Sequence, residues 1–153
     1  MRKEIWRLAL AEQDMRLVAS AAQELADAHA PSLVLEAGLV VIYCRSFSGA
    51  PKGGRVPEHV VDELAPKSHL HQKLWEARNR MYGHTDEDYE LRRKAVDVFG
   101  THSYSVEYQH LNPALFDPFR ALALALAENF KGAREEREQA LRDTGVEPEP
   151  LVL

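Results

Sequence analysis

Hydrophobic residues recur with a helical period along most of the chain. From Lys3 to about Ala28 they return at spacings of three, four and seven, which predicts one long amphipathic helix. Its apolar residues are Trp6, Leu10, Leu17, Ala21 and Leu25. The segment from Ser32 to about Phe47 is apolar on nearly all sides. We therefore expect a second helix at the centre of the core, with Cys44 packed there as a small hydrophobic side chain.

The middle of the chain predicts a loop and two further helices. Three glycines and a proline in residues 48–56 predict the loop. Residues 57–65 predict a short helix, because the proline at its start suits a first helical turn. Pro66 then interrupts the chain, and Ser68 is the predicted N-cap of a helix that reaches about Tyr82.

Beyond residue 86 the period changes from helical to alternating. Val96 and Val98, and then Tyr104, Val106 and Tyr108, alternate with polar residues, and a glycine lies between the two groups. This pattern predicts a short β-hairpin.

A last helix is predicted to begin at Asp117 as N-cap and Pro118 as first helical residue, and to end at Gly145. Its apolar residues are Phe119, Leu122, Leu126 and Phe130. We expect an all-α protein, an up-and-down four-helix bundle with an extra short helix and a small β-hairpin before the last helix. The expected domain organisation is one helical domain at residues 1–145 and a C-terminal tail at 146–153.

Composition narrows the class of protein. A chain of 153 residues that is 45% hydrophobic can bury one ordinary core. The longest apolar run is too short to span a bilayer, and the N-terminus has no apolar signal core, so we expect a cytoplasmic protein without membrane contact. A single cysteine fits a reducing compartment. The net charge of -5 argues against non-specific coating of nucleic acid but leaves room for a small basic pocket.

Candidate chemistry is concentrated in residues 70–88, LHQKLWEARNRMYGHTDED. Helical spacing predicts a core stripe of Leu70, Leu74, Ala77 and Met81. A second stripe, about 100° away, consists of His71, Trp75, Arg78 and Tyr82. Arg78 is thus predicted between two aromatic residues, where a guanidinium can be partly desolvated and still make a bidentate contact with phosphate.

The position of His84 depends on Gly83, which is a good helix terminator. On an unbroken helix Arg78 and His84 would lie about 120° apart and would not point at one phosphate. Either Gly83 turns the histidine back, or two copies of the protein form a joint site.

These residues resemble the signature of the HEPN superfamily of helical domains, which is Arg, usually Asn or another polar residue, and His after four to six positions. The likeness is greatest to a branch that includes abortive-infection proteins, with a motif near RNKxxAHSD; residues 78–86 here are RNRMYGHTD. Upstream, YCRSFSGAPKGG at residues 43–54 and the Leu70-His71 pair are also similar to that branch. Gly83 and Thr85 depart from the usual alanine and serine, but both are similar in size.

The resemblance implies a homodimer in which two motifs meet across the second and third main helices. Active members of the family cut RNA endonucleolytically without a metal or cofactor. By this resemblance, Arg78 holds the scissile phosphate and stabilises its transition-state charge, and Asn79 orients the phosphate or the histidine. His84 exchanges protons with the 2'-hydroxyl or the leaving oxygen, a role that suits an imidazole with an unperturbed pKa of about 6.5.

Further residues are assigned to RNA contacts. Trp75 and Tyr82 are expected to stack against a base, and Arg80 and Arg45 to extend the RNA-binding surface. Arg45 has a simpler alternative, a charge at a helix C-terminus. Asp86 caps the turn after the helix or holds the motif histidine by a hydrogen bond.

Structural alternatives remain open for the motif itself. Arg78 can pair with Glu76 of a neighbouring copy or with Asp86, and a histidine beyond a helix C-terminus is favoured by the helix dipole. His69 and His71 lie on different helix faces, so no metal site is expected.

Two classes of function follow from the sequence. The first is a HEPN-like, metal-independent endoribonuclease of a toxin or phage-defence type, held in check by an antitoxin or another regulatory protein. The second is a non-catalytic HEPN-like module that binds RNA or a nucleotide, or only dimerises. A structural helical bundle without a site is a third possibility.

Overall fold

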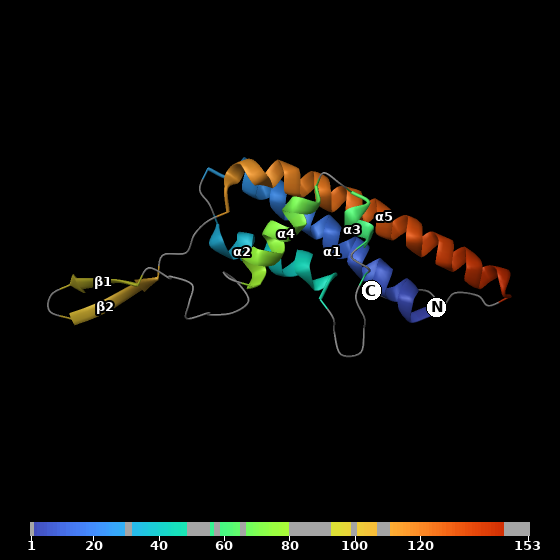
Figure 1. Ribbon diagram of the computed structural model, residues 1–153, viewed down its shortest axis with the longest axis horizontal. Helices are drawn as coiled ribbons and strands as arrows, with labels where there is room; N and C mark the ends of the chain where they lie inside the picture. The colour runs from blue at the N-terminus through green and yellow to red at the C-terminus, as the bar shows by residue number, and fades with distance from the viewer. Residues whose placement is uncertain are drawn as a thin grey trace.

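The computed structural model describes residues 2–29, 32–48, 56, 59–64, 67–79, 93–98, 101–106 and 111–145. Its helices are α1 Arg2–Asp27, α2 Leu33–Arg45, α3 His59–Asp62, α4 Ser68–Ala77 and α5 Phe116–Asp143 (Figure 1). A short 3-10 helix, Pro113–Leu115, leads into α5. Strand β1, Arg93–Val98, pairs antiparallel with β2, Thr101–Val106. The expectation of a mostly helical protein is confirmed.

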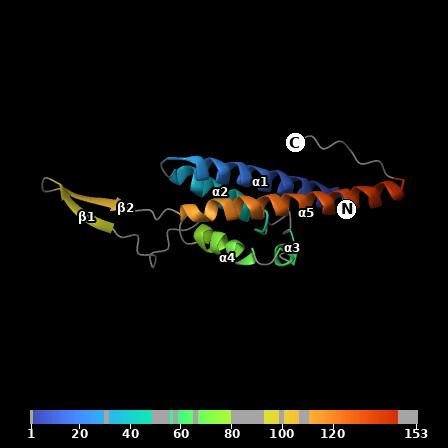
Figure 2. The ribbon, with the colours of Figure 1, turned by 90° about the horizontal axis from the view of Figure 1, so that it is seen from above.

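The two longest helices, α1 and α5, run side by side in opposite directions and form the spine of the molecule (Figures 1 and 2). Helix α2 returns along α1, and α4 packs against α2 and α5. The hairpin of β1 and β2 lies beyond one end of these helices (Figure 1). No helix in the described ranges is long and apolar enough to cross a membrane.

The four longer helices and α3 share one hydrophobic core. Helix α5 contributes the residues that its period predicts, and all four are almost inaccessible to solvent: Phe119, Leu122, Leu126 and Phe130. Helix α5 begins at Phe116, one residue before the predicted N-cap, so Asp117 lies in its first turn. It ends as predicted, because Gly145 has a left-handed φ of 76° that glycine adopts without strain.

The predicted apolar stripe of the first helix is wrong by part of a turn. Trp6 and Leu17 are 50% and 49% exposed, whereas Met15 and Val18 are fully buried. Leu25 alone of the five predicted residues is buried. The helix carries apolar residues on more than one side, and the burial shows that the side with smaller alanines and Met15 faces the core that α1 shares with α5 and α2. Period alone did not distinguish between these sides.

Two further local predictions need correction. Helix α2 is not buried on all sides, since Val34 and Val41 are 85% and 46% exposed, although Cys44 is buried as expected. Ser68 does not cap α4: it is the first helical residue, and the preceding Lys67 makes no side-chain capping bond. By contrast, the hydroxyl of Ser32 accepts a hydrogen bond from the Leu35 amide and caps α2.

Candidate functional site

Helix α4 presents two adjacent faces that its sequence predicts. Leu70, Leu74 and Ala77 are buried and hold the helix against the core. The neighbouring face carries His71, Trp75 and Arg78 at spacings of four and three. All three are partly buried, so this face is neither core nor open surface.

His71 contacts two aromatic residues, Tyr43 near the end of α2 and Phe47 in the turn that follows it. The hydroxyl of Tyr43 lies 3.0 Å from its Nδ1 atom, and the ring of Phe47 meets the imidazole edge to face with centroids 4.8 Å apart. Burial raises the pKa of Tyr43, so its phenol keeps its proton across the physiological range. The phenol can therefore donate to Nδ1, which leaves the proton of a neutral imidazole on Nε2.

The aromatic contacts continue along α4 toward its C-terminal end. The His71 ring stacks beside Trp75 with centroids 6.1 Å apart. The guanidinium carbon of Arg78 lies 5.8 Å from the centre of the Trp75 ring, a cation-π contact. Imidazole, indole and guanidinium thus form one continuous row, which we call the α4 row.

Arg78 also contacts its neighbour in sequence. Its Nη1 atom donates to the Asn79 side-chain oxygen at 2.8 Å. Both residues lie in a π-helical turn that follows α4, a local geometry that widens the helix and recurs at functional sites. Within the described ranges no carboxylate pairs with Arg78, so a neutral amide is the only side-chain oxygen on this guanidinium there.

Behind the row lies Cys44, whose thiol donates to the carbonyl oxygen of Leu74 at 3.7 Å. Burial raises the pKa of the Cys44 thiol to about 12, and the positive charge of Arg78 opposes only part of this change. A thiol that stays protonated is a poor nucleophile. Cys44 is therefore a packing residue at the back of the site.

Arg45 belongs to a different contact. Its guanidinium forms two hydrogen bonds with the carboxylate of Asp14, which is buried in α1. These bonds raise the pKa of Arg45. The structure thus places Arg45 as a tie between α1 and α2, with 64% of its side chain exposed, and does not bring it onto the α4 row.

Of the residues assigned to the site from sequence, Trp75, Arg78 and Asn79 are brought together at the end of α4. Arg80, Tyr82, His84 and Asp86 lie outside the described residues. The same holds for Met81 of the core stripe and for Gly83.

Sequence reasoning gave no role to His71 or Tyr43. The available signal was the spacing of four between His71 and Trp75, which places two rings one above the other on a helix. The partner of His71 comes from a helix 28 positions earlier, and no local pattern predicts that contact.

Within the described ranges, no group of three or more His, Cys, Asp or Glu side chains is arranged to hold a metal ion. Comparisons of the chain with models of known protein families, with curated proteins and with solved structures give no match.

Proposed function

We propose that the protein is a HEPN-like endoribonuclease that cuts RNA without a metal ion at a site completed by a second copy of the chain. The observation that carries the proposal is Arg78, which is held over Trp75 and next to Asn79 at the end of α4. Arg78 is the first residue of the RNRMYGHTD motif, and the resemblance to the HEPN signature assigns phosphate binding to this residue.

The setting of Arg78 suits a phosphate. The guanidinium is partly desolvated by the Trp75 ring, which strengthens its attraction to an anion. Its contact with Asn79 is a bond to a neutral amide oxygen, and a charged phosphate oxygen is a stronger acceptor for the same donor. A phosphodiester can thus accept two hydrogen bonds from the Arg78 guanidinium. The Asn79 amide is then released to contact the phosphate or the motif histidine.

In the proposed reaction the 2'-hydroxyl oxygen attacks the adjacent phosphorus, and the bond from phosphorus to the 5'-oxygen breaks. His84 exchanges the protons, taking one from the 2'-hydroxyl or giving one to the leaving oxygen. Arg78 stabilises the extra negative charge on phosphorus-bound oxygens. The products are a 2',3'-cyclic phosphate and a free 5'-hydroxyl, and no metal takes part.

The proposed assembly is a HEPN-like four-helix bundle, with α1, α2, α4 and α5 as its main helices, that forms a homodimer. The shared core of these helices supports the bundle. The exposed valines of α2, Val34 and Val41, support a second copy as a partner, since they add apolar surface to the helix that the family uses for dimer contact. An antitoxin or another regulatory protein in the cytoplasm is the proposed restraint on the nuclease.

The nuclease proposal is tested by incubating purified protein with mixed RNA in excess chelator. Wild type is expected to produce fragments with cyclic phosphate ends, and Arg78→Ala and His84→Ala to leave the RNA intact. Lys73→Ala is the matched control, since Lys73 is an exposed cation on α4 outside the row. Intact RNA with the wild type, or equal cutting by the Arg78 and His84 variants, refutes the nuclease.

The alternative is a non-catalytic HEPN-like module that binds RNA or a nucleotide, or only dimerises. The α4 row favours it, because a guanidinium and an indole can hold a phosphate and a base without any histidine that transfers protons. RNA that stays intact, yet binds to wild type and not to Arg78→Ala, supports this alternative.

A further inference from the structure

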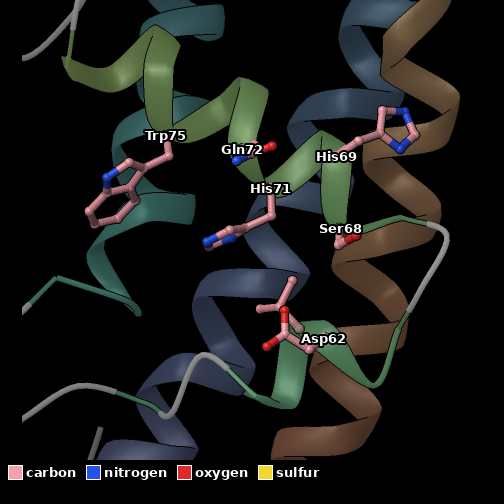
Figure 3. Close-up of a pocket in the computed structure, with 7 residues that line it drawn as sticks. Asp62, Ser68, His69, His71, Gln72 and Trp75 are labelled. Carbon is pink, nitrogen blue, oxygen red and sulfur yellow. The ribbon is translucent and has the colours of Figure 1, made fainter.

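A pocket of about 430 Å³ opens between α3 and α4, next to the α4 row (Figure 3). Val61 and Trp75 give it apolar surface, and Asp62, Ser68 and Gln72 give it polar groups. Its volume lies within the range of sites for small organic ligands. His71 also lines it, so the pocket and the row share the rings of His71 and Trp75.

The shared wall is fixed in place before any ligand binds. Tyr43 and Phe47 contact the His71 imidazole, and Trp75 stacks beside it. Side chains with locked rotamers lose little entropy when they bind a ligand. Two adjacent aromatic rings with fixed positions favour a flat, aromatic ligand such as a nucleobase.

On the side of the pocket opposite His71, the polar group is the carboxylate of Asp62. The carboxylate belongs to α3 and projects to the same side as the His71 ring, across the pocket from it (Figure 3). None of the described residues forms an ion pair with it. A carboxylate accepts hydrogen bonds through two oxygens and, when charged, donates none. A ligand edge with two neighbouring hydrogen-bond donors is the chemical match for this side chain.

We propose that this pocket holds a guanine base of the RNA substrate, with its N1 and N2 hydrogens donated to Asp62. Guanine is the base whose Watson-Crick edge has two adjacent donors. Uracil places carbonyl oxygens on both sides of its single donor, and adenine and cytosine place an acceptor nitrogen beside their amino group. The amide of Gln72 supplies a donor for an acceptor of the guanine, O6 or N7.

The location of the pocket connects base recognition to the proposed cleavage. Arg78 covers the Trp75 ring at 5.8 Å, and the same indole lines the pocket. A guanosine whose base occupies the pocket therefore carries its phosphate toward Arg78. This inference rests on the proposed function, which it deepens by naming the base next to the scissile phosphate.

Binding is tested without cleavage, by the fluorescence of Trp75 in a Trp6→Phe background that removes the other tryptophan. Guanosine 5'-monophosphate is expected to change the signal and to bind about tenfold more tightly than uridine 5'-monophosphate. Asp62→Asn is expected to abolish that preference. The matched control is Glu63→Gln, the same change at an exposed neighbour that does not line the pocket.

Cleavage supplies the second readout. Wild type is expected to cut next to guanine, and Asp62→Asn to cut with that preference lost. If RNA stays intact but guanosine monophosphate binds in an Asp62-dependent way, the nuclease fails and the pocket stands. A different result overturns the guanine pocket while the nuclease stands. In that case RNA is cut in an Arg78-dependent way, but the two nucleotides bind equally, do not bind, or bind without dependence on Asp62.

Discussion

The hydroxyl of Tyr43 lies 3.0 Å from Nδ1 of His71 and joins the buried side of α2 to the ring that begins the α4 row. Tyr43 is fully buried, and His71 is partly buried. The bond fixes the direction of the imidazole relative to both the pocket and Trp75. The geometry of the site is thus set by a contact between helices as well as by α4 itself.

Removing this hydroxyl is expected to cost stability and to free the ring. In Tyr43→Phe the aromatic packing stays, one hydrogen bond is lost, and the free energy of unfolding should fall by about 1 kcal/mol. Urea unfolding measures the loss, and the nitrogen chemical shifts of His71 report its altered tautomer balance. An unchanged unfolding curve together with unchanged shifts would show that the bond does not form in solution.

Two neighbours on α1 should respond differently to truncation. Met15 is fully buried, so Met15→Ala is expected to lower the free energy of unfolding by about 2 to 5 kcal/mol. Leu17 is 49% exposed, and Leu17→Ala should cost about 1 kcal/mol or less. Chemical denaturation of both variants measures the difference. A larger loss for Leu17→Ala would contradict the orientation of α1.

The stability of the protein should depend on the carboxylate of Glu36 as a hydrogen-bond acceptor. The carboxylate is inaccessible to solvent, and its Oε2 atom accepts a hydrogen bond of 2.9 Å from the Leu111 amide. Glu36→Ala leaves that amide without this acceptor and is expected to cost about 1 to 3 kcal/mol. Glu36→Gln keeps an acceptor oxygen and should cost less. Equal thermal denaturation midpoints for the two variants would exclude this role.

Cys44 should make the protein less stable in alkali. Its pKa is about 12 in the folded protein against 9.0 as the ordinary value, because burial disfavours the thiolate. Between these pH values the unfolded chain loses a proton that the folded protein keeps, so stability falls as pH rises. From about pH 8 to about pH 10 the free energy of unfolding should fall by about 1.4 kcal/mol, which corresponds to one pKa unit.

The comparison for this pH effect is Cys44→Ala, measured by urea unfolding at the same pH values. The variant should lose less stability over this interval than the wild type. Tyr43 also has a raised pKa and acts in the same direction at higher pH; burial, the larger cause of its shift, is present in both proteins, whereas the smaller effect of the Cys44 charge is lost in the variant. Parallel pH profiles of wild type and variant would show that Cys44 does not ionise on unfolding.

Helical period predicted most of the fold because burial follows it closely where only one side of a helix is apolar. The buried residues of α5 and the stripe Leu70, Leu74 and Ala77 of α4 are of this kind. On α1 apolar residues occur on several sides, and the packing of α1 against α5 and α2 decides which of them are buried. Val34 shows the same limit, since an apolar residue can equally face solvent.

In the candidate site, too, some contacts could be predicted from the sequence and others could not. Contacts between residues three or four apart, such as Trp75 with Arg78, follow from the spacing of side chains on one helix. Contacts that join separate helices, such as Asp14 with Arg45 and Tyr43 with His71, depend on how the helices pack. Sequence reasoning therefore found the row and missed what holds it.

Helix α4 has three buried side chains, whereas α1 has ten and α5 has eight. The free energy needed to detach α4 alone is correspondingly smaller than that needed to separate the spine. Amide hydrogens of α4 should therefore exchange with solvent through local opening events while those of α1 and α5 remain protected. Substitutions that strengthen the spine will then raise the melting temperature without slowing the opening of α4, so thermal stability and the lifetime of the assembled α4 row can evolve independently.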